Sequence, residues 1–399
     1  MLLLKMLTFN RNFVEQARLE NEASRAPKGF TAILAGAVAL GGCTTFPSDR
    51  MGKCGGVPAI GTLADGSREM RLSVLTYNVE GLPWPARQNR GPRLLEITRQ
   101  LAAKRASGTA PDIVLIQEAF TNTAVRIGER AGYANYVRGP GAGMRRPPTS
   151  EEAEPELVER RKRGKGEGFP QFMPSGLYIL SDFAIMQATR QPFRSRECAG
   201  FDCLSNKGLL HARVAVPGLP QPVDLFNTHL NSRGSTGVSE HRSLLAHRLQ
   251  VEETGRFIET HRDPANPLIF GGDFNMRNAP DRYERFAMTK PWPIVHEWCL
   301  RPSAGCDVRL SWDGDTPWMD TQDLQGFDSG TRVTVRPERV EAMFDAPWKG
   351  RPLADHDGFL VVYRLSWQPA PEEPDMVQSR CSARLSKRLA GVSTSGANS

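Results

Sequence analysis

Seven short runs of large apolar residues recur along the chain between residues 72 and 365. Each run is too short for a typical helix and is rich in Val, Ile, Leu and Phe, a composition typical of buried β-strands. The predicted strands are residues 72–78, 113–117, 177–181, 210–216, 223–229, 268–271 and 359–365.

Two longer stretches between these runs have helical periodicity. Residues 93–104 place Leu94, Ile97 and Leu101 on one face of a helix, and residues 240–261 repeat apolar residues every seven positions. Strands that alternate with helices predict a layered α/β domain. A chain of 399 residues is long enough for one large domain with tails.

Three segments lack this regular pattern. Residues 43–70 are polar and Gly-rich, which predicts a tether. Residues 139–168 combine Pro, Gly and dense mixed charge, which predicts a flexible surface insertion. Residues 367–399 are rich first in Pro and Glu and then in Ser, which predicts a disordered tail. The folded domain is therefore expected over residues 71–366.

A short apolar run near the front has the layout of a secretory signal. Arg25 and Lys28 precede it, and it ends in the sequence LGGC at Cys43, which resembles a bacterial lipoprotein signal. We expect residues 1–42 to be a signal peptide and Cys43 to be lipidated. The protein would then be exported and anchored in the cell envelope, at the periplasmic face or the cell surface. The alternatives are a start further along the chain, because 42 residues is long for such a signal, or a core helix with a chance Cys.

Composition sets limits on the class of protein. Apolar residues make up 39% of the chain and charged residues 24%, as in globular proteins. The mean hydropathy is negative, which excludes a multi-span membrane protein. The net charge is +7, and it falls to +5 without residues 1–42, which hold five Lys/Arg and three Glu. This mild basic excess is weak evidence for nucleic-acid binding.

The chain has seven cysteines. If Cys43 is lipidated, six remain, and an exported compartment permits disulfides. The absence of any C-x₂-C pair argues against structural zinc. The expected disulfides join Cys198 to Cys203, Cys299 to Cys306, and Cys54 to Cys381.

Polar residues suited to metal binding or proton transfer stand beside five of the predicted strands. Each alone is usually a turn former, but a sheet gathers its strand ends into one crevice. Carboxylate and amide oxygens suit hard divalent cations, and His can act as a base. The chain lacks the H-E-x-x-H, G-x-S-x-G and Walker A motifs, which argues against zinc proteases, α/β-hydrolases and NTPases. The residues are Asn78, Glu118, His229, Asn231, Asp273, Asn275, Asp355 and His356.

The ordered motifs TYNVEG, QEAF, THLNS, GGDFN and DHDG resemble the endonuclease/exonuclease/phosphatase superfamily over roughly residues 71–366. The resemblance implies a DNase-like, four-layered α/β sandwich in which two packed β-sheets are flanked by helices. It also implies hydrolysis of a phosphoester bond with Mg²⁺, or Mn²⁺, as cofactor.

The same resemblance assigns roles residue by residue. Glu118 and Asn78 match metal ligands, and Asp355 matches a second metal-site carboxylate. Asp273 and Asn275 match the pair that orients the attacking water and contacts phosphate. The remaining assignments are His229 as the phosphate-stabilising histidine, His356 as the general base and Asn231 as a substrate-binding residue.

Members of the superfamily usually carry an Asp before the final motif that holds the catalytic His. The corresponding run here is RVEAMF, which places Glu341 in that role. A different alignment assigns the role to Asp345.

The segment CAGFDCLSNKG is similar to a stretch of neutral sphingomyelinases. In that group an Asp and a Lys five residues later form a pair near the active site, here Asp202 and Lys207. An ammonium group beside the scissile phosphate would stabilise charge in the transition state. One departure is the lack of the aromatic hairpin before the last motif, where Trp348 is the sole aromatic residue between Phe344 and Asp355.

We therefore expect a monomeric phosphodiesterase that cleaves a phospholipid head group at a membrane surface, like a sphingomyelinase or phospholipase C. An exported DNase-type endonuclease is an alternative, because the basic run at residues 160–163 could meet a phosphate backbone. Inositol phosphate phosphatase and a non-enzymatic surface lipoprotein are further alternatives. The presence of Asn78, Glu118, His229 and His356 favours an enzyme over a scaffold.

Overall fold

The computed structural model describes residues 46–146, 154–194, 197–289, 292–314 and 322–369. Within these ranges, no helix combines the length and apolar character needed to cross a membrane. The predicted signal, Cys43, Cys381 and nearly all of the predicted tail lie outside the described residues.

A mixed sheet of eight strands has the order β10-β12-β13-β2-β3-β5-β4, with β1 beside β2. β2 and β3 run parallel, whereas β13 and β5 flank them in antiparallel orientation. Along β2, Leu72 and Val74 face one hydrophobic cluster while Leu75 and Tyr77 face another, as the twofold repeat of a strand requires. The strands are β1 (Gly61–Thr62), β2 (Arg68–Asn78), β3 (Ile113–Gln117), β4 (Asn135–Arg138), β5 (Tyr178–Ser181), β10 (Asp307–Arg309), β12 (Thr334–Met343) and β13 (Gly358–Trp367).

A second sheet of five strands has the order β11-β9-β8-β7-β6. Only β8 and β9 in this sheet pair in parallel, and their register places His229 opposite Asp273. The strands are β6 (Ala184–Pro192), β7 (Gly208–Ala215), β8 (Val223–His229), β9 (Leu268–Asp273) and β11 (Asp323–Asp328).

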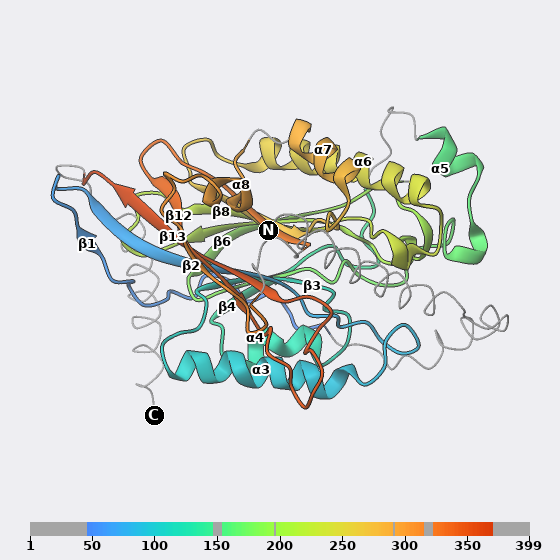
Figure 1. Ribbon diagram of the computed structural model, residues 1–399, viewed down its shortest axis with the longest axis horizontal. Coiled ribbons are helices and arrows are strands. Elements are labelled where there is room, and N and C mark those ends of the chain that lie inside the picture. Colours follow the sequence, from blue (N-terminus) through green and yellow to red (C-terminus); the bar gives the residue numbers. More distant parts are fainter. Residues whose placement is uncertain (1–45, 147–153, 195–196, 290–291, 315–321, 370–399) are drawn as a thin grey trace, which may run out of the picture. The chain divides into compact units, whose positions relative to one another are not determined.

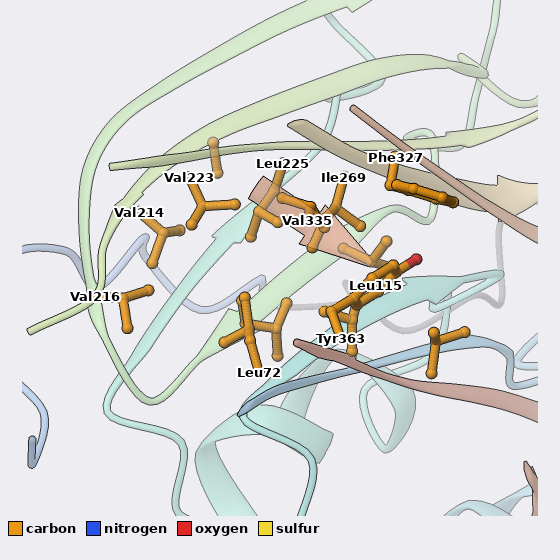
Figure 2. Close-up of a cluster of buried hydrophobic side chains, with 14 of the residues drawn as sticks. Leu72, Leu115, Val214, Val216, Val223, Leu225, Ile269, Phe327, Val335 and Tyr363 are labelled. Carbon is orange, nitrogen blue, oxygen red and sulfur yellow. The ribbon is translucent and has the colours of Figure 1, made fainter. Parts of the chain in front are cut away.

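The two sheets pack face to face around a large apolar core, part of which Figure 2 shows. α3 and α4 cover the outer face of the eight-stranded sheet, and α6 and α7 cover the outer face of the five-stranded sheet (Figure 1). The predicted four-layered α/β sandwich is confirmed. The helices are α3 (Arg90–Ala106), α4 (Ile127–Arg130), α5 (Pro155–Glu159), α6 (Glu240–His261), α7 (Pro280–Thr289) and α8 (Val295–Cys299), with short 3₁₀ turns η1 (Ala124–Arg126), η2 (Arg163–Lys165), η3 (Gly200–Leu204) and η4 (Gly234–Thr236).

Parts of the segments expected to be irregular pack on this sandwich. Arg50, within the predicted tether, forms a β-bridge with Tyr136, and β1 pairs with β2. At the end of the predicted insertion, Glu167 is 2% exposed and its carboxylate pairs with Arg242 of α6 at 2.7 Å. The described part of the tether therefore contributes to the folded domain, and the end of the insertion is anchored to α6.

Two of the expected disulfides are confirmed, Cys198–Cys203 and Cys299–Cys306. Cys54 is also disulfide-bonded, and Cys381, its predicted partner, lies outside the described residues.

Candidate active site

The ends of central strands from both sheets meet at one edge of the sandwich. Asn78 ends β2 and Glu118 follows the last residue of the adjacent parallel strand β3. His229 and Asp273 end the parallel pair β8 and β9 in the other sheet. A parallel pair brings the carboxyl ends of its strands to one edge, which is why these side chains converge.

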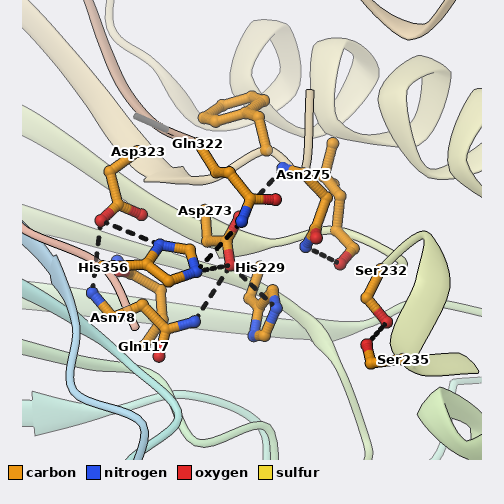
Figure 3. Close-up of polar contacts among 12 residues, drawn as sticks. Asn78, Gln117, His229, Ser232, Ser235, Asp273, Asn275, Gln322, Asp323 and His356 are labelled. Atoms are coloured by element: carbon orange, nitrogen blue, oxygen red, sulfur yellow. Dashed lines mark hydrogen bonds and ion pairs between the residues drawn. The ribbon is translucent and has the colours of Figure 1, made fainter. Parts of the chain in front are cut away.

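A hydrogen bond joins the two sheets at this edge. Nδ2 of Asn78 donates to Oδ2 of Asp273 at 3.0 Å (Figure 3). The same Asp273 oxygen lies 3.3 Å from Nε2 of His229 and 3.9 Å from Nε2 of His356. Burial raises the pKa of Asp273 to about 6, although the charge of His356 opposes this rise. Asp273 is thus the central acceptor of the site.

His356 lies between two carboxylates. Its Nδ1 is 3.5 Å from Oδ2 of Asp323, and its Nε2 is 3.3 Å from the side-chain amide of Gln322 (Figure 3). Burial opposes protonation of His356, but Asp323 and Asp273 outweigh burial and raise its pKa to about 10. The two carboxylates therefore make His356 a strong base, stabilised as a cation.

The carboxylate that holds His356 was misassigned from the sequence. Glu341 lies on β12 and pairs with Arg309 at 3.2 Å and with Arg339 at 3.5 Å. Asp345 accepts a hydrogen bond from the backbone of Trp312. Asp323 makes the expected carboxylate contact with His356 instead, because the antiparallel register of β11 and β9 sets it opposite Asp273. The signal available in the sequence was an Asp at the start of the run DLQGFD.

Glu118 is half-buried and has a backbone φ of 57°, in the left-handed region. Burial and the nearby charges of Asp355 and Asp273 raise its pKa to about 7, although Lys207 and His356 act in the opposite direction. Carboxylates that raise one another's pKa are stabilised together by a hard divalent cation. With the amide oxygen of Asn78, this donor set fits Mg²⁺ or Mn²⁺.

Asp355 is more exposed than the other predicted ligands. Its side chain is 47% exposed and pairs with Nη2 of Arg87 at 3.4 Å. Arg87 also pairs with Glu80 at 2.7 Å, and Glu80 pairs with Arg90 at 3.0 Å. The sequence pattern did not predict this series of ion pairs, which links Asp355 to the loop after β2.

Asp273, Asp323 and His356 also have the spacing of a metal-binding cluster, since one ligand atom from each lies within 4.8 Å of the others. The ion pairs of His356 with both carboxylates account for this spacing without an ion. We therefore interpret the cluster as a proton-handling group.

Lys207 and Asp202 form the expected pair. Nζ of Lys207 donates to Oδ2 of Asp202 at 2.9 Å, contacts Nε2 of His229 at 3.0 Å and donates to the carbonyl oxygen of Leu230 at 2.9 Å. Burial, Lys207 and His356 together depress the pKa of His229 well below its usual value. His229 is therefore neutral, with the ammonium group held against it.

The two predicted Asn residues make backbone contacts. Nδ2 of Asn275 donates to the carbonyl oxygen of Leu230 at 3.0 Å, and its own backbone N–H donates to Asp273 at 2.9 Å. Asn231 is fully buried; its Oδ1 accepts from the backbone N–H of Ala199 at 2.9 Å and its Nδ2 donates to Ser232. This geometry makes Asn231 a loop-fixing residue, in contrast to the substrate-binding role expected from the sequence.

The comparison with protein families identifies the family of the chain. The profile of the Endonuclease/Exonuclease/phosphatase family matches residues 75–333, a range that includes Asn78, Glu118, His229 and Asp273. The chain belongs to this family. The relatives that follow are what the chain is similar to within and beyond this family.

Curated relatives include a sphingomyelinase of Mycobacterium bovis and one of Mycobacterium tuberculosis, each 25% identical over 307 residues. The alignments cover 73% of this chain and 52% of the relatives, so the chain spans about half the length of the curated relatives it matches. Among solved structures, a mutant beta toxin from Staphylococcus aureus with bound magnesium ions is similar, with a TM-score of 0.50 and 14% identity. That match covers 75% of this chain and 100% of the toxin chain, and it concerns the fold alone.

Proposed function

We propose that the protein is a Mg²⁺-dependent phosphodiesterase that cleaves the head group of a phospholipid, in the manner of a sphingomyelinase or phospholipase C. The observation that carries this proposal is the convergence of Glu118, Asn78, Asp273, His356 and the Lys207–His229 pair at one edge. Membership of the family supports phosphoester hydrolysis, and the sphingomyelinase relatives support the choline-lipid branch.

Glu118 and Asn78 would hold the cation, joined by Asp355 when its ion pair with Arg87 opens. When bound, the cation stabilises negative charge on the phosphate oxygens and favours ionisation of water. Its positive charge would also oppose protonation of His356, whose pKa the carboxylates of Asp323 and Asp273 raise to about 10.

His356 accepts the proton of the attacking water, and Asp323 stabilises the resulting imidazolium ion. Asp273 and Asn275, which are linked by a backbone hydrogen bond, orient that water and the phosphate. The ammonium group of Lys207 supplies a fixed positive charge at His229, where negative charge develops on the phosphate oxygens. Each of these roles uses a group already fixed by contacts within the protein.

Exposed aromatic residues support a lipid substrate. Trp84 and Trp312 are each 62% exposed. Trp84 lines a cavity of about 360 Å³ together with Arg87, the residue that contacts Asp355. The backbone N–H of Trp312 donates a hydrogen bond to Asp345, which lies in the segment between β12 and the DHDG motif. Trp is favoured at membrane interfaces because its side chain combines a large apolar ring with a polar N–H group.

A lipid anchor would complement these contacts. In this proposal the protein is exported and lipidated at Cys43, so that it works as a monomer at the envelope membrane. The LGGC sequence and the disulfide-bonded cysteines support export. A single acyl chain binds membranes weakly, so protein contacts such as Trp84 would add to retention.

A substrate panel tests the proposal. The full chain would be assayed with Mg²⁺ on sphingomyelin, phosphatidylcholine, duplex DNA and inositol phosphates. We expect release of phosphocholine from a choline lipid. Rapid cleavage of DNA with strong salt sensitivity, and no cleavage of any lipid, would replace the lipid assignment with the nuclease alternative.

A further inference from the structure

The turn that carries Asp202 is closed covalently. The Cys198–Cys203 disulfide spans five positions, and Asp202 lies inside the ring on η3 (Gly200–Leu204). Oδ2 of Asp202 accepts hydrogen bonds from Nζ of Lys207 at 2.9 Å and from the backbone N–H of Ser232 at 2.6 Å. The ring therefore carries the carboxylate that connects η3 to the Lys207–His229 pair.

Two further contacts fix the start of this turn. Oε1 of Glu167 accepts from the backbone N–H of Gly200 at 2.8 Å, and Glu167 is itself held by Arg242. Gly200 has a φ of 64°, and a Cβ there would lie 2.1 Å from the carbonyl oxygen of Thr236. These contacts fix the backbone position of the first half of the ring. The disulfide links that half to Cys203, so we infer that it also limits movement of Asp202.

Asp202 supplies the carboxylate that contacts Lys207 directly, and the charges of Glu118 and Asp273 act on the ammonium group as well. The Lys207 side chain is 7% exposed, and its other two contacts are the uncharged His229 and the carbonyl oxygen of Leu230. A buried ammonium group that loses its carboxylate partner is strongly destabilised, and it then deprotonates or moves towards solvent. Either change removes the positive charge from His229.

We propose that the Cys198–Cys203 disulfide is a positioning element for Lys207, and that its reduction switches the site to a low-activity state. The effect on turnover rests on the proposed function, whereas the effect on Lys207 itself does not. Cys198 is half-buried, and in this proposal the thiolate of an external dithiol attacks its sulfur. The attack forms a mixed disulfide at Cys198 and releases the Cys203 thiolate. The second thiolate of the reagent then attacks the reagent sulfur of the mixed disulfide and releases the Cys198 thiolate. The reagent leaves as a cyclic disulfide, and the two electrons that it loses reduce the protein disulfide to two thiols.

The test compares two disulfide deletions in the full chain. Cys198→Ser/Cys203→Ser removes the ring. Cys299→Ser/Cys306→Ser is the matched control, because this disulfide joins the end of α8 to the residue before β10, an edge strand of the eight-stranded sheet. Native acetylation followed by mass spectrometry measures exposure of the Lys207 amine. We expect Lys207 to react at least tenfold faster in the first variant and at the wild-type rate in the control.

Turnover of bis(p-nitrophenyl) phosphate gives the second measurement. The ring deletion should lower kcat about 10²-fold, and it should add no further loss when Lys207→Ala is already present. Equal labelling of Lys207 with and without the ring would overturn the proposal, as would additive losses of kcat. If wild-type protein hydrolyses no phosphodiester, the proposed function fails while the labelling result still decides this inference. If the ring deletion does not fold, brief dithiothreitol treatment of wild-type protein followed by the same labelling replaces it.

Discussion

The carboxylate of Asp323 contacts His356 across the join between the two sheets, with Oδ2 of Asp323 lying 3.5 Å from Nδ1 of His356. The same carboxylate oxygen lies 3.5 Å from the backbone nitrogen of Asn78. Asp323 thus holds His356, the proposed base, and touches the strand end that carries a predicted metal ligand. In the proposed mechanism this contact would couple proton transfer at His356 to the geometry of both sheets.

Asp323→Asn should keep the side-chain size and remove its charge. Only neutral His356 accepts a proton, so the rate should fall as the pH drops through the pKa of His356. The carboxylates raise this pKa, so they place the acid limb of the pH–rate profile above the usual His value of 6.5. The variant should lower kcat on the order of 10²–10⁴-fold and shift the acid limb to lower pH. A pH–rate profile measures both effects.

Glu341→Gln is the matched control for Asp323→Asn. Its profile should match that of the wild-type protein, because Glu341 pairs with Arg309 and Arg339. A large loss in Glu341→Gln together with an unchanged profile in Asp323→Asn would restore the assignment made from the sequence.

Binding of Mg²⁺ should release protons near neutral pH. Glu118 has a pKa raised to about 7, so it is largely protonated below that value and must ionise to bind the cation. The apparent affinity should therefore rise as pH increases, by up to about tenfold per unit below pH 7. Calorimetry in two buffers of different ionisation enthalpy measures the proton release. An affinity that does not change between pH 5.5 and pH 8 would contradict the assignment of Glu118.

Lys207→Ala should lower kcat about 10²–10³-fold, as expected when an electrostatic donor is lost. It should also raise the pKa of His229, because burial and the charge of Lys207 together depress that pKa. NMR titration of the His229 ring would follow the change. Lys165→Ala is the control, since that exposed ammonium group lies over the ring of Phe201. Equal behaviour of the two variants would argue against a role for Lys207.

Trp84→Ala should weaken binding to sphingomyelin vesicles while leaving hydrolysis of a soluble phosphodiester unchanged. Burial of one large apolar side chain contributes on the order of 2 kcal/mol, so vesicle affinity should fall roughly 10–30-fold. Leu300→Ala is a suitable control, because Leu300 is also a large apolar residue and is 61% exposed. It lies two positions after Trp298, which packs on Phe327 near the end of β11 that is away from Asp323. Equal vesicle affinity in all three proteins would remove Trp84 from the membrane contact.

The sequence pattern predicted the central elements accurately. The bounds of β3, β8 and α6 agree with the predicted ranges. Continuous apolar runs and apolar residues spaced seven positions apart indicate which positions are buried. The proposed ligands Asn78 and Glu118 could be placed for the same reason, since Asn78 ends such a strand and Glu118 follows one.

β11 was not predicted because only Leu324 and Phe327 of its six residues are large and apolar, although most of the strand is buried. Gln325 is fully buried and donates from Nε2 to the carbonyl oxygens of Val74 and Phe359, a polar contact between the sheets. Gly326 leaves space for the ring of Phe270, since a Cβ there would lie 2.1 Å from that ring. Without β11 the sequence offered no strand to place Asp323 beside His356. Tertiary packing, which hydropathy does not report, decided this part of the site.

Turnover after removal and return of the metal tests the central claim most directly. Full-length wild-type protein and Glu118→Gln would be treated with EDTA, and hydrolysis of a soluble phosphodiester would be followed before and after excess Mg²⁺ is added. We expect no turnover in EDTA, recovery in the wild-type protein and a much smaller recovery in folded Glu118→Gln. Full turnover in excess chelator, or equal recovery in the two proteins, would contradict it.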